Sequence, residues 1–162
     1  MAQDITLPVG EGYVNLRVGA IIEKDGKVLM VGSDDVDYYY SVGGRIQFGE
    51  SAEEALRREV REETGCALEI DRPGFVHETF FPGDSPAKRG KLVYEICFYY
   101  YMKTPADFEP VCRSFTEDGS GERLVWVPLD TPKRLYPAFF RTELAHPVPC
   151  LRHILTDERN ET

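Results

Sequence analysis

The sequence predicts a single α+β domain in which helices pack on a mixed β-sheet. Segments rich in Val, Ile and aromatic residues, which suit strands, recur along most of the chain. Two segments with helical features interrupt them, so the order is strands, helix, strands, helix. We find no linker that would separate domains, and a chain of 162 residues suits one hydrophobic core, so we assign residues 1–162 to one domain.

The expected strands follow from hydrophobic patterning and from the turns between them. We expect them at residues 13–22, 28–31, 38–42, 68–81, 92–102, 124–127 and 151–155. Asp25-Gly26 favours a tight hairpin because both residues tolerate positive φ. Arg72-Pro73-Gly74 should interrupt its strand, since proline lacks the N–H that a sheet needs. Segment 92–102 is apolar on both faces and should lie inside the sheet.

Two helices are expected, at residues 51–64 and 138–145. Ser51 and Glu54 have the spacing of a capping box, in which each side chain bonds the other's backbone N–H. Gly65 follows at the position where a helix end prefers glycine. The second helix lies between two prolines, which limit its length.

Composition narrows the class of protein. Lys and Arg number 19 against 28 Asp and Glu, a net charge of −9 that disfavours a nucleic-acid partner. We find neither a signal peptide nor an apolar run that could span a membrane. The scattered cysteines form no zinc-type pair, so we expect reduced thiols and a cytoplasmic location.

The chemistry is concentrated between Gly44 and Cys66. Glu59, Glu62 and Glu63 follow helical spacing and share one face, where like charges repel. A divalent cation with oxygen ligands would relieve that repulsion, and Mg²⁺ also binds phosphates. This pattern therefore predicts a metal site for phosphoryl chemistry, although acidic helix faces are often simply solvated.

The residues beside this face suggest a rigid loop. Arg58 can pair with Glu54 or Glu62 along the helix, or with Glu50 in the preceding loop. Glycines in that loop let the backbone approach a ligand closely. A backbone carbonyl near Gly44 is a candidate further metal ligand.

This segment resembles the Nudix hydrolase motif, G-x5-E-x7-R-E-U-x-E-E-x-G-U, where U is a bulky aliphatic residue. The matching residues are Gly44, Glu50, Arg58, Glu59, Val60, Glu62, Glu63 and Gly65. The sequence departs from the pattern at Cys66, which replaces the last aliphatic residue, and at Val42, where many members have proline.

The resemblance implies the Nudix fold, a mixed sheet sandwiched between helices (α/β/α). It also implies hydrolysis of a nucleoside diphosphate derivative with Mg²⁺, or Mn²⁺ as a substitute. By the same resemblance Glu59, Glu62 and Glu63 are metal ligands and catalytic residues, with Glu59 able to act as base, and Glu50 and Arg58 form a structural pair. Family members often recruit a further acid from a later loop; Glu117 and Glu122 are the candidates. A homodimer is also implied as possible.

Substrate-binding residues are harder to select. Tyr40 and Phe81 belong to an aromatic-rich set that could stack on a base or simply fill the core. Arg45 lies inside the motif loop and is our candidate phosphate-binding residue. Pro82 follows the motif at a distance similar to that of a proline in the ADP-ribose-cleaving subgroup, although turn chemistry also explains it.

These observations favour a small nucleotide-type substrate, of the ADP-ribose or nucleotide-sugar kind. A nucleoside triphosphate pyrophosphohydrolase is the main alternative. A catalytically weak regulator that only binds nucleotides is a second, which the intact glutamates disfavour. An isomerase of isoprenoid diphosphates is a third, but no cysteine has the surrounding motif that such chemistry needs.

Overall fold

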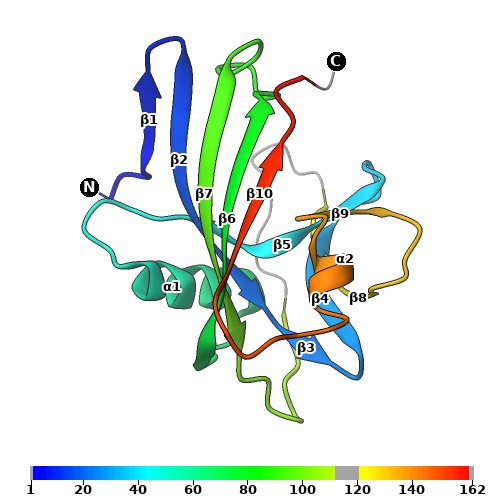
Figure 1. The fold of residues 1–162 in the computed structure, drawn as a ribbon. Coiled ribbons are helices and arrows are strands. Elements are labelled where there is room, and N and C mark those ends of the chain that lie inside the picture. Colours follow the sequence, from blue (N-terminus) through cyan, green and yellow to red (C-terminus); the bar gives the residue numbers. More distant parts are fainter. Residues whose placement is uncertain (1, 112–120, 161–162) are drawn as a thin grey trace.

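The computed structural model describes residues 2–111 and 121–160. Its main features are a ten-stranded sheet and two helices, α1 (Ala52–Thr64) and α2 (Phe140–Glu143) (Figure 1). The strands are β1 (Thr6–Val9), β2 (Gly12–Ile21), β3 (Glu23–Lys24), β4 (Lys27–Gly32), β5 (Tyr38–Arg45), β6 (Ile70–Pro82), β7 (Leu92–Met102), β8 (Arg123–Pro128), β9 (Arg134–Tyr136) and β10 (Arg152–Asp157).

The sheet is mixed, as the sequence predicts. Its order is β10-β6-β7-β2-β5-β4-β3, while β1, β8 and β9 pair with β2, β4 and β5 respectively. The β2–β7, β6–β10 and β5–β9 pairs are parallel. Strand β5 pairs with β4 through its first residues and with β2 through its last, so it joins the two halves of the sheet. The predicted interior position of residues 92–102 is confirmed, because β7 lies between β6 and β2.

The helices lie on opposite faces of this sheet. Leu56 and Val60 of α1 are fully buried against Val18 and Ala20 of β2. On the other face, Phe140 of α2 is fully buried in a second cluster with residues of β6 and β7, including Tyr99. These two cores produce the predicted layered arrangement.

The local signals for α1 and the hairpin are confirmed. The Ser51 hydroxyl accepts a hydrogen bond from the Glu54 N–H, and the Glu54 carboxylate accepts one from the Ser51 N–H. Gly65 ends the helix in the left-handed region, at φ 73°. Asp25 and Gly26 both have positive φ in the turn between β3 and β4.

Other elements differ from the expectation. Strand β6 is continuous, because register shifts around Pro73 absorb the missing N–H without ending the strand. Helix α2 is only four residues long, and hydrogen bonds from Arg141 to three carbonyls of the loop between β8 and β9 hold it in place. Strands β1, β3 and β9 were not expected; each is short and depends on a neighbouring strand.

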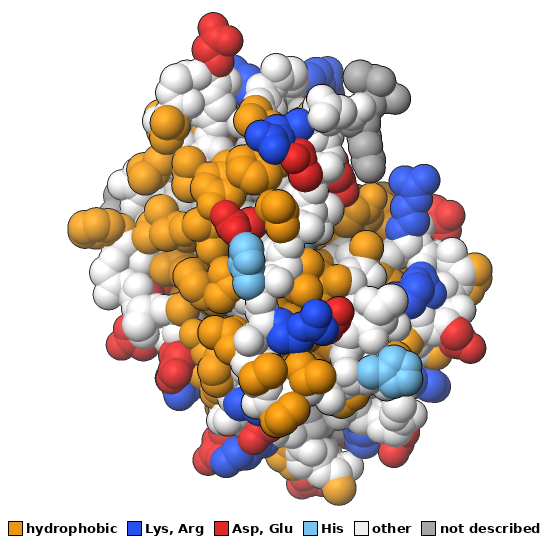
Figure 2. Space-filling view, viewed as in Figure 1, with side chains coloured by type: hydrophobic (Ala, Val, Ile, Leu, Met, Phe, Trp, Pro, Cys, Tyr) orange, Lys and Arg blue, Asp and Glu red, His pale blue; other side chains and the backbone are white. Residues whose placement is uncertain are grey.

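Figure 2 shows apolar side chains gathered on one outer face of the protein. Leu7, Val9, Leu92 and Leu155 are among the exposed large hydrophobic residues. The expected homodimer stays a prediction. Within residues 2–111 and 121–160, no helix is long and apolar enough to cross a membrane. Cys66, Cys97 and Cys150 are free thiols, whereas Cys112 lies outside the described residues.

Candidate functional site

Two of the predicted glutamates of α1, Glu59 and Glu63, lie against the end of β5. The Glu63 carboxylate accepts a hydrogen bond of 3.3 Å from the Gly43 N–H. Glu59 lies so close to Gly44 that a Cβ there would be 2.3 Å from the Glu59 Oε1. Glycine at position 44 therefore leaves room for this carboxylate, which a larger residue would displace. Glu62, one turn away, extends outward and its side chain is 59% exposed.

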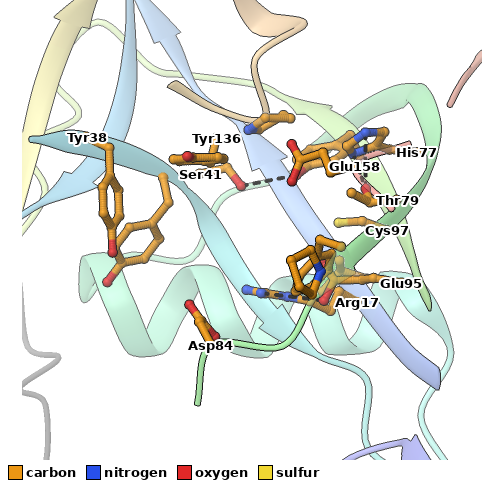
Figure 3. Close-up of a pocket in the computed structure, with 16 residues that line it drawn as sticks. Arg17, Tyr38, Ser41, His77, Thr79, Asp84, Glu95, Cys97, Tyr136 and Glu158 are labelled. Carbon is orange, nitrogen blue, oxygen red and sulfur yellow. Dashed lines mark hydrogen bonds and ion pairs between the residues drawn. The ribbon is translucent and has the colours of Figure 1, made fainter. Parts of the chain in front are cut away.

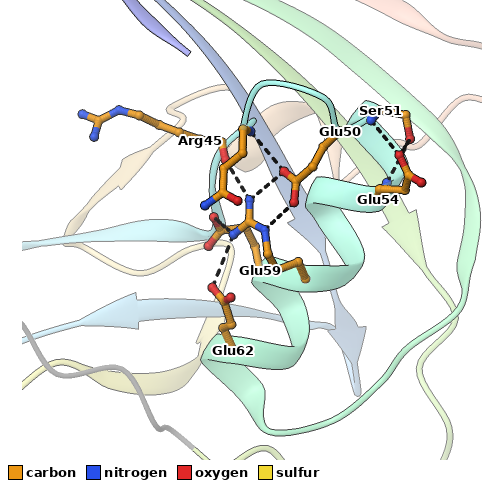
Figure 4. A network of polar contacts seen from close by, with 8 residues as sticks. Arg45, Glu50, Ser51, Glu54, Glu59 and Glu62 are labelled. Carbon is orange, nitrogen blue, oxygen red and sulfur yellow. Dashed lines mark hydrogen bonds and ion pairs between the residues drawn. The ribbon is translucent and has the colours of Figure 1, made fainter. Parts of the chain in front are cut away.

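Arg58 ties the preceding loop to the helix (Figure 4). Its Nε and Nη2 donate to the two carboxylate oxygens of Glu50, at 2.7 and 2.9 Å. It also donates to Glu59 at 2.7 Å, to Glu62 at 3.4 Å and to the Arg45 carbonyl at 3.1 Å. The guanidinium thus has an acceptor on every side, and this bidentate geometry fixes the loop against α1.

The pKa values of the carboxyl groups follow from this crowding. Burial raises the pKa of Glu63 to about 8, and the neighbouring charge of Glu59 adds to the rise. Burial also raises the pKa of Glu59, although Arg58 opposes this effect. In contrast, the hydrogen bonds from Arg58 lower the pKa of Glu50. Ionising Glu59 and Glu63 therefore costs free energy unless a cation lies beside them.

The donor set fits a hard divalent cation. The glutamates would supply carboxylate oxygens, and the Gly44 backbone beside Glu59 would supply a carbonyl, which are ligand types that Mg²⁺ prefers. As the side chains stand, no group of three acidic, histidine or cysteine residues in the described part of the chain converges on one point. The reason is that Arg58 engages Glu59 while Glu62 extends into solvent.

A cavity of about 470 Å³ opens on the sheet (Figure 3). Strands β2, β5, β6, β7 and β9 contribute its walls. Its aromatic lining consists of Tyr38, Tyr40, Phe81, Tyr99 and Tyr136. Ser41, His77 and Thr79 add neutral polar groups, and the volume falls within the range of small-molecule pockets.

The charges in the cavity are mostly negative. Asp84, Glu95 and Glu158 line it, while Arg17 supplies a single cation among the lining residues. Burial alone would lower the pKa of the Arg17 guanidinium, but the combined effect of Glu95, Cys97, Tyr99 and Glu63 outweighs it, so the net shift is upward. Burial lowers the pKa of His77 to about 4, which keeps this imidazole neutral near pH 7.

Two lining residues connect the cavity with the acidic face of α1. Arg17 and Tyr40 both line the cavity, and both interact electrostatically with Glu63. The Tyr40 hydroxyl also donates a hydrogen bond to Glu122. Glu122 is therefore brought near Glu63, whereas the other candidate acid, Glu117, lies outside the described residues.

Only some of the residues predicted to bind substrate line the cavity. Tyr40 and Phe81 line the cavity, and their role in substrate binding stays a prediction. Arg45 does not line it; its side chain points away from the helix network in Figure 4 and lies 3.7 Å from the Asp4 carboxylate. Sequence reasoning missed Arg17 and His77, because neither belongs to a motif and only strand pairing brings them to the cavity.

Fold and motif together define a Nudix-type domain. The NUDIX domain family matches residues 15–144, so this chain belongs to the Nudix hydrolase family. The crystal structure of a MutT Nudix hydrolase from Burkholderia pseudomallei is similar, with 25% identity and a TM-score of 0.57, over 80% of this chain and 98% of that one. An ADP-ribose pyrophosphatase from Streptococcus suis shares the fold at 18% identity and TM-score 0.52, over 86% and 98% of the two chains.

A curated relative is similar over a shorter stretch. The CTP pyrophosphohydrolase of Escherichia coli K12 is 44% identical over 57 residues, which is 33% of this chain and 42% of that protein. The match thus spans less than half of the relative's length.

Proposed function

We propose that this protein hydrolyses the diphosphate linkage of a nucleoside diphosphate derivative, with Mg²⁺ as cofactor and Mn²⁺ as a substitute. One observation carries the proposal. Glu59 and Glu63 of α1 lie against Gly44 and Gly43, and two residues of an aromatic-lined cavity, Arg17 and Tyr40, interact electrostatically with Glu63. Such a site can hold a metal-bound diphosphate at the carboxylates and the rest of the substrate in the cavity.

The roles of the residues follow from their positions. Glu59, Glu62 and Glu63, with the Gly44 carbonyl, would hold the ion. When bound, Mg²⁺ neutralises phosphate charge and makes a bound water more acidic. Glu59 and Glu63 are the candidate bases, which would accept a proton from the attacking water. Glu122 is the candidate further acid, because it lies near Glu63.

The charge of the cavity favours a sugar-linked substrate, such as ADP-ribose or a nucleotide sugar. Sugar hydroxyls can donate hydrogen bonds to carboxylates such as Asp84 and Glu95, whereas a triphosphate tail would be repelled by them. Tyr38 and Phe81 offer faces for a base or a sugar ring.

A nucleoside triphosphate is the second candidate substrate. It is favoured by the similarity to CTP pyrophosphohydrolase, which at 44% identity covers 57 residues. In that case the charged tail would lie entirely at the carboxylates of α1, and only the nucleoside would enter the cavity.

A substrate panel tests the proposal. The protein is incubated with ADP-ribose, UDP-glucose, CTP and deoxynucleoside triphosphates, with Mg²⁺ or with a chelator, and products are separated by chromatography. We expect Mg²⁺-dependent cleavage, fastest with a sugar-linked compound. Cleavage of CTP alone would favour the second candidate. No cleavage of any compound would contradict the proposal.

Matched variants locate the activity on the acidic face. Glu62→Gln removes one exposed carboxylate from the proposed ligand set and should reduce turnover at least 100-fold without unfolding the protein. Glu53→Gln makes the same change on the same helix, at a residue paired with Arg57. The second variant should behave as wild type. Equal rates for both variants would contradict the site assignment.

A further inference from the structure

Arg17 is the one arginine or lysine among the described residues that line the cavity. It lies on β2, paired in register with Arg45 of β5 and with Cys97 of β7. The face of β2 that carries it also carries Gly19, and the Tyr99 ring lies across that glycine. The Arg17 side chain extends into the cavity toward Glu95 (Figure 3).

The guanidinium of Arg17 has far fewer contacts than that of Arg58. Arg58 donates to Glu50, Glu59, Glu62 and a backbone carbonyl at 3.4 Å or less. The Nη1 of Arg17 is 3.9 Å from Glu95 Oε2, which is too long for a hydrogen bond. Because a guanidinium carries five N–H donors, Arg17 has unused capacity on the side that faces the cavity.

Neutralisation of Glu95 does not account for this geometry. Glu95 accepts a hydrogen bond of 3.2 Å from the Asn15 amide. An arginine that served only to balance Glu95 would be expected to bond it closely, as Arg58 bonds Glu50. The Arg17 side chain is instead 35% exposed, and the surface it exposes faces the cavity.

The place of Arg17 suits a phosphate. It lies within electrostatic reach of Glu63 on the acidic face, and it also lines the cavity. A diphosphate that extends from the metal ligands of α1 into the cavity would pass this side chain. Arginine presents paired N–H groups that match phosphate oxygens, so one guanidinium here can bind and orient the diphosphate.

We propose that Arg17 is the phosphate-binding residue of the cavity: its unused guanidinium N–H groups bind the diphosphate at the boundary between the cavity and the α1 carboxylates. This inference rests on the proposed function, since it assigns a residue to the same substrate. It places the phosphate contact at Arg17 rather than at Arg45, whose side chain points elsewhere.

Pyrophosphate binding tests this assignment. Inorganic pyrophosphate with Mg²⁺ is titrated into wild type, Arg17→Gln and Arg17→Lys in a calorimeter. We expect Arg17→Gln to weaken the affinity at least tenfold. Arg17→Lys should weaken it less, because lysine keeps the positive charge but lacks the paired N–H groups of arginine. Arg57→Gln, which removes an exposed arginine on the outer side of α1, serves as the matched control and should bind as wild type.

Three results would overturn the inference: unchanged affinity in Arg17→Gln, equal losses in Arg17→Gln and Arg57→Gln, or no pyrophosphate binding by wild type. Thermal unfolding checks each variant, and if Arg17→Gln does not fold, the comparison of Arg17→Lys with wild type decides. A loss of stability in Arg17→Lys without a loss of affinity would assign Arg17 a structural role.

Steady-state kinetics separates this inference from the proposed function. With the best substrate of the panel, Arg17→Gln should raise KM more than Arg57→Gln does. Turnover by wild type with an unchanged KM in Arg17→Gln would overturn the inference and leave the proposed function standing. Loss of pyrophosphate affinity in Arg17→Gln without any turnover by wild type would support the inference and contradict the proposed function.

Discussion

The loop–helix segment around Arg58 and the cavity around Arg17 use arginine in opposite ways. Arg58 is surrounded by acceptors that come from residues close in sequence, so its guanidinium is fully engaged. Arg17 meets one carboxylate at 3.9 Å and faces open space. The first arrangement holds a framework rigid, and the second leaves donors for a ligand. Counting the hydrogen-bond partners of a partly buried arginine thus helps to separate structural from binding residues.

The largest expected effect concerns the contact that positions Glu59. In Gly44→Ala the added Cβ would stand 2.3 Å from the Glu59 Oε1, so the carboxylate must move. We expect turnover to fall about 100-fold, a loss typical of a displaced catalytic group. Unfolding by urea should be nearly unchanged, because the Glu59 side chain can yield. Turnover within threefold of wild type would contradict the proposed role of this contact.

The next effect tests the framework. Arg58→Ala removes the cation that pairs with Glu50 and Glu59. Partly buried carboxylates that lose charged hydrogen bonds destabilise the folded state. We expect the free energy of unfolding to fall by about 3 kcal/mol, the lower end of the range for breaking a buried ion pair, because Arg58 and Glu50 are partly exposed. Urea denaturation measures it. A similar loss in Arg17→Gln would remove the distinction between the two arginines.

Metal binding should depend on pH because of Glu63. Its pKa of about 8 means that the carboxyl is mostly protonated at pH 7, and binding an ion would release that proton. Apparent Mg²⁺ affinity should therefore rise by up to about tenfold per pH unit below 8 and level off above it. Calorimetry in buffers of different ionisation enthalpy reports the proton release, which Glu63→Gln should abolish. An Mg²⁺ affinity that does not change with pH would exclude Glu63 as a ligand.

The smallest effect concerns the cavity wall. His77 is 6% exposed, and its folded pKa of about 4 lies below the ordinary value of 6.5. Between these values the unfolded chain binds a proton that the folded protein does not. Stability is therefore complete above pH 6.5 and falls as pH drops toward 4, by about 1 kcal/mol over the first pH unit. In urea unfolding at several pH values, His77→Asn should reduce this dependence of stability on pH. An unchanged dependence would contradict the role given to His77.

The sequence was most informative where contacts are local. The capping box, Gly65 and the Glu50–Arg58 pair join residues within a few turns of each other, so spacing alone indicates their geometry. The cavity could not be predicted in the same way. Arg17 and His77 come from β2 and β6, and only the order of strands brings them together. Arg45 was selected because of its place in the motif, but its side chain direction depends on the N-terminal segment, where Asp4 pairs with it.

A crystal structure of the protein with Mg²⁺ and inorganic pyrophosphate tests the central claim most directly. We predict an ion held by Glu59, Glu62, Glu63 and the Gly44 carbonyl, with the pyrophosphate between this ion and the Arg17 guanidinium. An ion bound elsewhere, with these glutamates still turned toward Arg58 or solvent, would contradict the account.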